Sequence, residues 1–123
     1  MKIRWMQMSV RFRITPTELQ AIERGQHVVE RLQIPGYGSW TAEIVPGASR
    51  TAINMNLACL RLMLSAANAA RLAEQEREGV YFATPDPSPF CLYIEKDLPC
   101  AHARAQEIIE PVTETFTCIT TRA

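Results

Sequence analysis

Three adjacent charged residues near the end of the chain could form a small catalytic or ligand-binding site. Glu95, Lys96 and Asp97 follow the segment 90–94, whose even-numbered residues are large and apolar. Successive side chains of a strand point to opposite faces, so Lys96 is expected inward and the two acidic residues outward. A lysine at the mouth of a core can bind a ligand or act in catalysis with a lowered pKa. The alternative is a strand end at which the ammonium group simply reaches water.

Four basic residues near the N-terminus form a second candidate site, for anions. Lys2, Arg4, Arg11 and Arg13 share the outward face of a predicted two-stranded hairpin. Together they could hold phosphates or a ligand carboxylate. The alternative is a solvated face that discourages pairing between sheet edges. No aromatic residues interleave with them on that face, and nothing nearby can read base edges. We therefore expect weak, salt-sensitive anion binding and no sequence-specific recognition of nucleic acid.

The pattern of cysteines and histidines predicts no metal site. Cys100 and His102 form the only close pair, whereas a structural zinc site needs four ligands. The four cysteines are scattered and show no C-x-x-C spacing, which is typical of reduced thiols in a cytoplasmic protein. The chain also lacks a glycine-rich phosphate-binding loop, so no cofactor is expected.

Composition indicates an ordinary globular protein. The 123 residues are 47% hydrophobic and 21% charged, with a formal net charge of zero, so there is no global attraction to nucleic acid or to an anionic membrane. No stretch approaches the ~20 apolar residues that span a bilayer, and the charged N-terminus does not resemble a signal peptide. We expect a single α+β domain over residues 1–100, followed by a tail over 101–123.

A strand that leads into a capped helix is the best-specified local structure. In the segment 9–25, apolar residues alternate with arginines up to Ile14, which predicts a half-buried strand. Thr15 and Glu18 then form a capping box with proline between them, and Gly25 can end the helix. A similar strand precedes Ser65, which is expected to cap an alanine-rich helix from about Ala66 to Glu78, ended by Gly79.

The two halves of the chain follow the same order. A shift of fifty residues aligns apolar classes, caps and turns, which predicts ββαββ pseudo-repeats over 2–45 and 52–95 around a common core. The predicted fold is mostly antiparallel, with about eight strands in a curved sheet or barrel-like sandwich and two main helices. In the tail, 101–110 could form a helix and 112–121 an edge strand; a loosely ordered terminus is the alternative.

Several segments resemble a family of short bacterial proteins of unknown function. They are the opening MKIR, the run 9–15 with Glu18, the Gly25-x-x-Val28 step, and the run 92–98 with Cys100. The resemblance covers roughly residues 1–100. It departs at the turn 6–9, where relatives tend to carry Gly-Asn-Ser, and in the tail, which lacks an acidic, proline-ended stretch. The resemblance implies an intact bacterial domain and assigns no activity.

We interpret the sequence as that of a non-enzymatic binding or protein-interaction domain. Its two histidines do not stand near a nucleophile with an orienting carboxylate. A homodimer is compatible with this interpretation, and the sequence identifies no other partner. The alternative is a small hydrolase or isomerase with a polar site at Lys96, assisted by Glu95 or Asp97.

Overall fold

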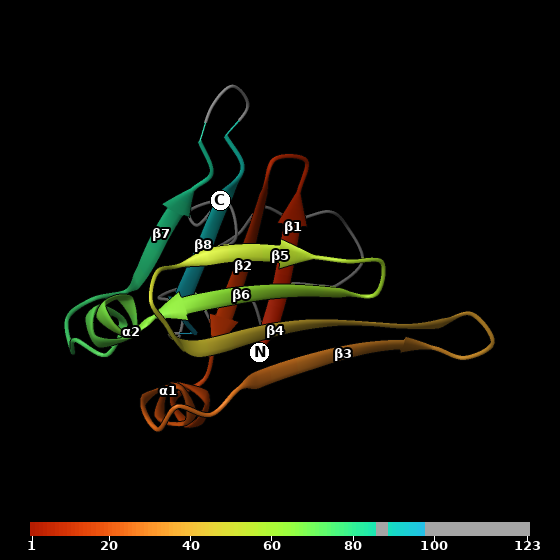
Figure 1. Cartoon of the computed structure of the whole chain (residues 1–123). Helices are drawn as coiled ribbons and strands as arrows, with labels where there is room; N and C mark the ends of the chain where they lie inside the picture. The colour runs from red at the N-terminus through yellow and green to blue at the C-terminus, as the bar shows by residue number, and fades with distance from the viewer. Residues whose placement is uncertain (86–88, 98–123) are drawn as a thin grey trace, which may run out of the picture.

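The computed structural model describes residues 1–85 and 89–97, which form two four-stranded sheets and two helices (Figure 1). Sheet A contains, in spatial order, β1 (Lys2–Met6), β2 (Ser9–Ile14), β8 (Cys91–Lys96) and β7 (Gly79–Ala83). Sheet B contains β3 (Val28–Ile34), β4 (Gly38–Ala48), β6 (Cys59–Ser65) and β5 (Ala52–Met55). The helices are α1 (Pro16–Glu23) and α2 (Ala66–Leu72). This arrangement confirms the predicted α+β class with eight strands, although the sheets do not close into a barrel.

The two sheets pack face to face around one apolar core, and their strands cross in direction (Figure 1). Alternate residues of the central strands supply this core, as the period-two pattern predicts. Phe12 on β2, Leu62 on β6, and Ile44 and Ile94 on β4 and β8 have no exposed surface. Ile22 and Leu72 add one buried residue from each helix. The helices therefore cover one end of the space between the sheets.

Each sheet contains strands from both halves of the chain. The outer pairings β1–β2, β7–β8, β3–β4 and β5–β6 are antiparallel hairpins, which confirms the mostly antiparallel prediction. The central pairings, β2 with β8 and β4 with β6, are parallel and join strands from different halves. Because β2 and β6 run toward their helices, the opposite end of both sheets carries the first residues of the central strands.

The helix starts confirm the predicted caps. Thr15 Oγ1 accepts a hydrogen bond from the Glu18 N–H at 3.2 Å, and Glu18 Oε1 accepts one from the Thr15 N–H at 2.9 Å. Ser65 Oγ accepts a hydrogen bond from the Asn68 N–H at 3.1 Å. Gly25 follows α1 with a positive φ of 78°, as a helix-ending glycine requires.

Three predicted boundaries differ from the structure. Helix α2 ends at Leu72, not at Glu78, because the residues after it are mostly charged and leave no apolar side chain to bury on that face. Gly79 therefore does not end the helix but begins β7. Strand β4 continues to Ala48 through an irregularity between Pro46 and Ala48, past residue 45, where the first predicted repeat ends. The predicted tail elements at 101–110 and 112–121 lie outside the described residues.

Candidate binding cavity

An apolar cavity of about 430 Å³ opens between the sheets at the end remote from the helices. Val10 and Leu60, the buried second residues of β2 and β6, form its floor. Its rim includes Trp5 and Met55, which are 61% and 68% exposed. The full lining is Trp5, Met6, Val10, Trp40, Ile53, Met55, Leu60, Thr84 and Phe90. Every lining side chain except that of Thr84 is hydrophobic, and the Thr84 hydroxyl oxygen accepts a hydrogen bond from the Phe90 N–H at 2.8 Å.

Two tryptophans from different sheets meet at this cavity. Trp5 comes from β1 and Trp40 from β4, and their rings pack edge to face with centroids 5.3 Å apart. This geometry is favourable for aromatic pairs. The pair also lines a second cavity of about 390 Å³, in which Glu30 and Arg31 add polar groups. The two tryptophans therefore line both an almost wholly apolar cavity and a partly charged one.

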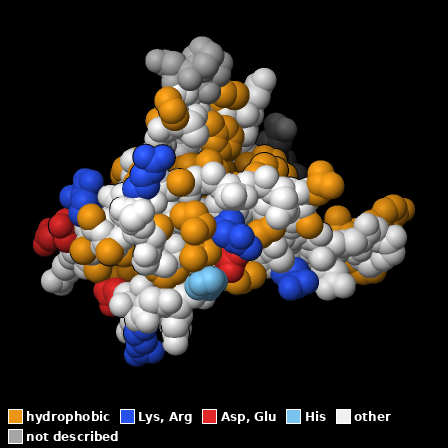
Figure 2. Space-filling model, in the orientation of Figure 1, with side chains coloured by type: hydrophobic (Ala, Val, Ile, Leu, Met, Phe, Trp, Pro, Cys, Tyr) orange, Lys and Arg blue, Asp and Glu red, His pale blue; other side chains and the backbone are white. Residues whose placement is uncertain are grey.

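Other exposed hydrophobic side chains lie in the two hairpin turns and do not line the cavity. Met8 lies in the turn between β1 and β2, and Leu57 lies in the turn between β5 and β6. Figure 2 shows hydrophobic side chains gathered above β5 and β6 and again along the projecting β3–β4 hairpin. Methionine side chains are flexible and adapt to ligands of different shape.

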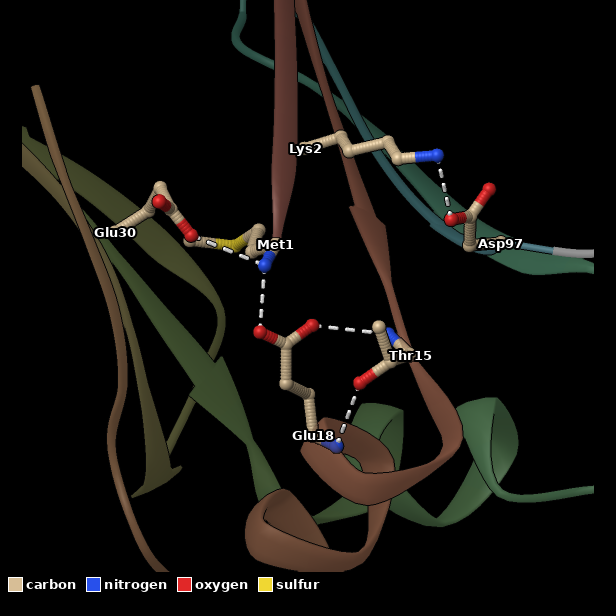
Figure 3. Close-up of polar contacts among 6 residues, drawn as sticks. All are labelled: Met1, Lys2, Thr15, Glu18, Glu30 and Asp97. Carbon is tan, nitrogen blue, oxygen red and sulfur yellow. Dashed lines mark hydrogen bonds and ion pairs between the residues drawn. The ribbon is translucent and has the colours of Figure 1, made fainter.

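A carboxylate cluster holds the amine of Met1 beside helix α1, away from the apolar cavity (Figure 3). The Met1 amine donates hydrogen bonds to Glu18 Oε2 at 2.6 Å and to Glu30 Oε1 at 3.1 Å. Burial alone would raise the pKa of Glu18, but the bonds from the Met1 amine and from Thr15 lower this pKa overall. Glu18 thus links the start of α1 to Met1, the residue before β1. Met1 in turn contacts Glu30 of β3.

The three predicted site residues, Glu95, Lys96 and Asp97, each contact a different partner. Lys96 Nζ donates a hydrogen bond to the backbone carbonyl of Glu74 at 2.7 Å, just beyond the end of α2. Glu95 Oε1 lies 3.3 Å from Arg11 Nε, and Asp97 Oδ2 lies 3.0 Å from Lys2 Nζ. Lys96 is not among the residues that line the cavities described above. The lysine and the two carboxylates therefore do not converge on a common space.

The four predicted anion-binding residues share the outer face of sheet A. In register, Lys2 pairs with Arg13 and Arg4 pairs with Arg11 across β1 and β2. Carboxylates from β8 and the segment after it reach this face, since Glu95 Oε1 also lies 3.8 Å from Arg13 Nε. The Arg11 guanidinium carbon lies 4.7 Å from the centroid of the Tyr93 ring on β8.

A separate charged cluster lies on the outer face of sheet B. Glu43 Oε1 accepts a hydrogen bond from Arg61 Nε at 2.9 Å, and His27 Nδ1 lies 2.9 Å from Glu43 Oε2. The hydrogen bond from Arg61 lowers the pKa of Glu43, burial opposes this, and the contact with His27 adds to the lowering.

This cluster predicts a contribution to stability that depends on pH. The folded pKa of Glu43 lies below its ordinary value, so the unfolded chain binds more protons between the two values. The stabilisation is complete above the ordinary glutamate value of about 4.3 and is lost as the pH falls through the folded pKa. In urea unfolding at a series of pH values, Glu43→Gln should show a shallower loss of stability on acidification than the parent chain. Glu23→Gln on α1 is the control, and an equal effect of both variants would contradict the prediction.

Among the described residues there is no group of three side chains that could hold a metal ion, and no helix is long and apolar enough to cross a membrane. Cys59 and Cys91 are free thiols. Cys100 and His102, the pair considered from the sequence, lie outside the described residues.

Sequence reasoning did not identify the apolar cavity. A period of two predicts the face that a side chain occupies, but it does not show which end of a sheet is left open. Trp5 is 61% exposed even though its ring packs against that of Trp40. The available signal was the accumulation of large apolar residues in and beside the β1–β2 and β5–β6 turns, at Met6, Met8, Met55 and Leu57.

Comparison with known proteins identifies a family without an assigned activity. No curated protein and no solved structure matches the chain. The family described as "Family of unknown function (DUF7009)" matches residues 1–113, which is most of the chain. The expected resemblance to a family of unknown function is thereby confirmed. This chain belongs to that family.

Proposed function

We propose that this chain is a non-enzymatic binding domain that takes a small, uncharged, apolar ligand into the cavity between its sheets. The observation that carries the proposal is the lining, in which eight of nine residues are hydrophobic and the single hydroxyl already accepts a hydrogen bond. A cavity of about 430 Å³ is within the range of small-molecule sites. Such a lining favours burial of apolar surface and penalises any charge on the ligand.

The lining residues also indicate where the cavity is rigid and where it can adapt to a ligand. Val10 and Leu60 supply a rigid floor, since both belong to central strands that are paired on two sides. Met6 and Met55 supply an adaptable rim. We therefore propose tolerance of ligand shape at the mouth and strict exclusion of polar groups at the floor.

The fluorescence of the tryptophans can be used to measure ligand binding directly. The chain contains two tryptophans, and both line the cavity. Titration with the neutral apolar dye N-phenyl-1-naphthylamine should quench their emission and increase the emission of the dye. An exposed rim position allows a charge to be introduced without disturbing the core.

We expect Met55→Glu to weaken binding of this dye by about tenfold or more, because its carboxylate would lose water when the dye enters. Leu57→Glu is the matched control, since Leu57 is fully exposed and does not line the cavity. Circular dichroism should show both variants folded. Equal dye binding by the two variants, or no binding by the parent chain, would contradict the proposed function.

We also propose that the chain arose by internal duplication, with repeats over 2–45 and 52–95. The parallel pairings support this. Ser9 pairs with Cys91 in sheet A, and the residues 50 positions from each, Cys59 and Thr41, pair in sheet B. The same relation maps the pair Phe12–Ile94 onto Leu62–Ile44. Because each sheet contains strands from both repeats, we propose that residues 1–100 form one domain.

We also propose that this domain lies in a bacterial cytoplasm, where Cys59 and Cys91 would stay reduced.

A further inference from the structure

The outer face of sheet A combines basic and aromatic residues that are far apart in the sequence. The registers of its three strand pairings place Arg4, Arg11, Tyr93 and Tyr81 in one row across the four strands. The adjacent row contains Lys2, Arg13 and Glu95. The β1–β2 hairpin itself puts no aromatic residue on this face, yet the pairing of β2 with β8 brings a tyrosine beside an arginine.

Contacts within this face connect the rings and the guanidinium group. The guanidinium carbon of Arg11 lies 4.7 Å from the centroid of the Tyr93 ring, which is a cation–π contact. The Tyr93 ring packs edge to face on Tyr81, with centroids 5.6 Å apart. Tyr81 is 51% exposed, so one ring of the row is open to solvent. The row therefore offers an aromatic surface next to positive charge.

The charge on this face remains positive after its ion pairs are counted. Four cations, Lys2, Arg4, Arg11 and Arg13, share the face with the carboxylates of Glu95 and Asp97, and the charge of Glu78 also acts on Tyr81, which leaves a net charge of +1. Glu95 contacts both Arg11 and Arg13. Such contacts fix the arginine side chains in place, which reduces the entropy that they lose when they bind a phosphate.

We propose that this face binds single-stranded nucleic acid without sequence preference. Bases stack on Tyr81 and the neighbouring Tyr93, and the phosphates interact with Arg4, Arg13 and Lys2. Aromatic stacking is tolerant of sequence because every base presents a π face, and a basic surface follows the backbone. A four-stranded sheet that carries aromatic rings is also a known geometry for this purpose. This site is independent of the apolar cavity, which lies between the sheets.

The proposal is tested by fluorescence anisotropy of a labelled short oligothymidylate with the full chain at low salt. Tyr81→Ala should weaken binding by about fivefold or more through lost stacking, whereas Tyr81→Phe should retain it. Tyr37→Ala is the matched control, because Tyr37 is 89% exposed in the turn between β3 and β4 of the other sheet. Arg4→Ala should weaken binding and reduce the salt slope by about one, with Arg31→Ala as its control.

An abasic oligomer of equal length separates stacking from charge, and it should bind at least about fivefold more weakly than oligothymidylate. Equal binding of the two oligomers would overturn the proposal, since a phosphate surface alone would explain it. Absence of binding at low salt, or equal effects of Tyr81→Ala and Tyr37→Ala, would also overturn it. Met55→Glu should leave oligonucleotide binding unchanged, so this test and the dye titration can fail separately.

Discussion

Replacing Phe12 with alanine is expected to lower the free energy of unfolding by about 3–5 kcal/mol. Phe12 lies in the middle of β2, has no exposed surface, and belongs to the core shared by both sheets. Its removal would leave a cavity that neighbouring strands cannot fill, because β2 is paired on both sides. Urea unfolding followed by circular dichroism measures this loss, which is a large share of the ~5–15 kcal/mol of a typical domain.

Leu57→Ala is the control for this prediction. Leu57 is fully exposed in the turn between β5 and β6, so the same kind of truncation should change stability by less than about 0.5 kcal/mol. If the two variants unfold at the same urea concentration, the core is not where the structure places it.

Gly79→Ala is expected to destabilise the fold by about 1–3 kcal/mol, through steric conflict. Gly79 is buried at the start of β7 and pairs with Glu95 of β8. A Cβ atom there would collide with the backbone carbonyl oxygen of Ile94 and lie 3.1 Å from the Cα of Glu95. Because these neighbours are backbone atoms of a central strand, they cannot move aside as a flexible side chain would.

Gly25 separates this steric effect from a conformational one. At Gly25, φ is positive and an added Cβ would meet nothing within 4 Å. Asparagine tolerates this conformation better than alanine does, so Gly25→Asn should be more stable than Gly25→Ala. At Gly79 the order should reverse, because asparagine is larger. The same order of stability at both positions would contradict the steric explanation.

Local structure could be predicted from the sequence because its signals lie within a few residues. The alternation before Ile14, the Thr15–Glu18 capping box and the Ser65 cap each specify a strand or a helix start without reference to the rest of the chain. The predicted end of this helix at Glu78 was wrong because helix-forming residues continue past Leu72, where α2 ends. In this case tertiary burial, not intrinsic propensity, decides where the helix ends.

Neighbouring strands could not be predicted in the same way. A period of two shows which face a side chain occupies but not which strand lies beside it. The sequence therefore placed Arg11 on an outward face but gave no sign that Tyr93 would lie against it. For the same reason it identified Glu95 and Asp97 as parts of a site with Lys96, whereas strand pairing directs them to Arg11 and Lys2.

The pairing of strands from different halves of the chain affects how fast the chain folds and how readily it aggregates. Strand β2 pairs with β8, whose residues are about 80 positions further along the chain, and loop closure of this length slows folding. During synthesis, β2 and β4 each emerge with one hairpin partner and one open edge. Those edges stay open until β6 and β8 have been made. The apolar faces of β2 and β4 are then exposed together with unpaired backbone groups, which is the arrangement most prone to aggregation.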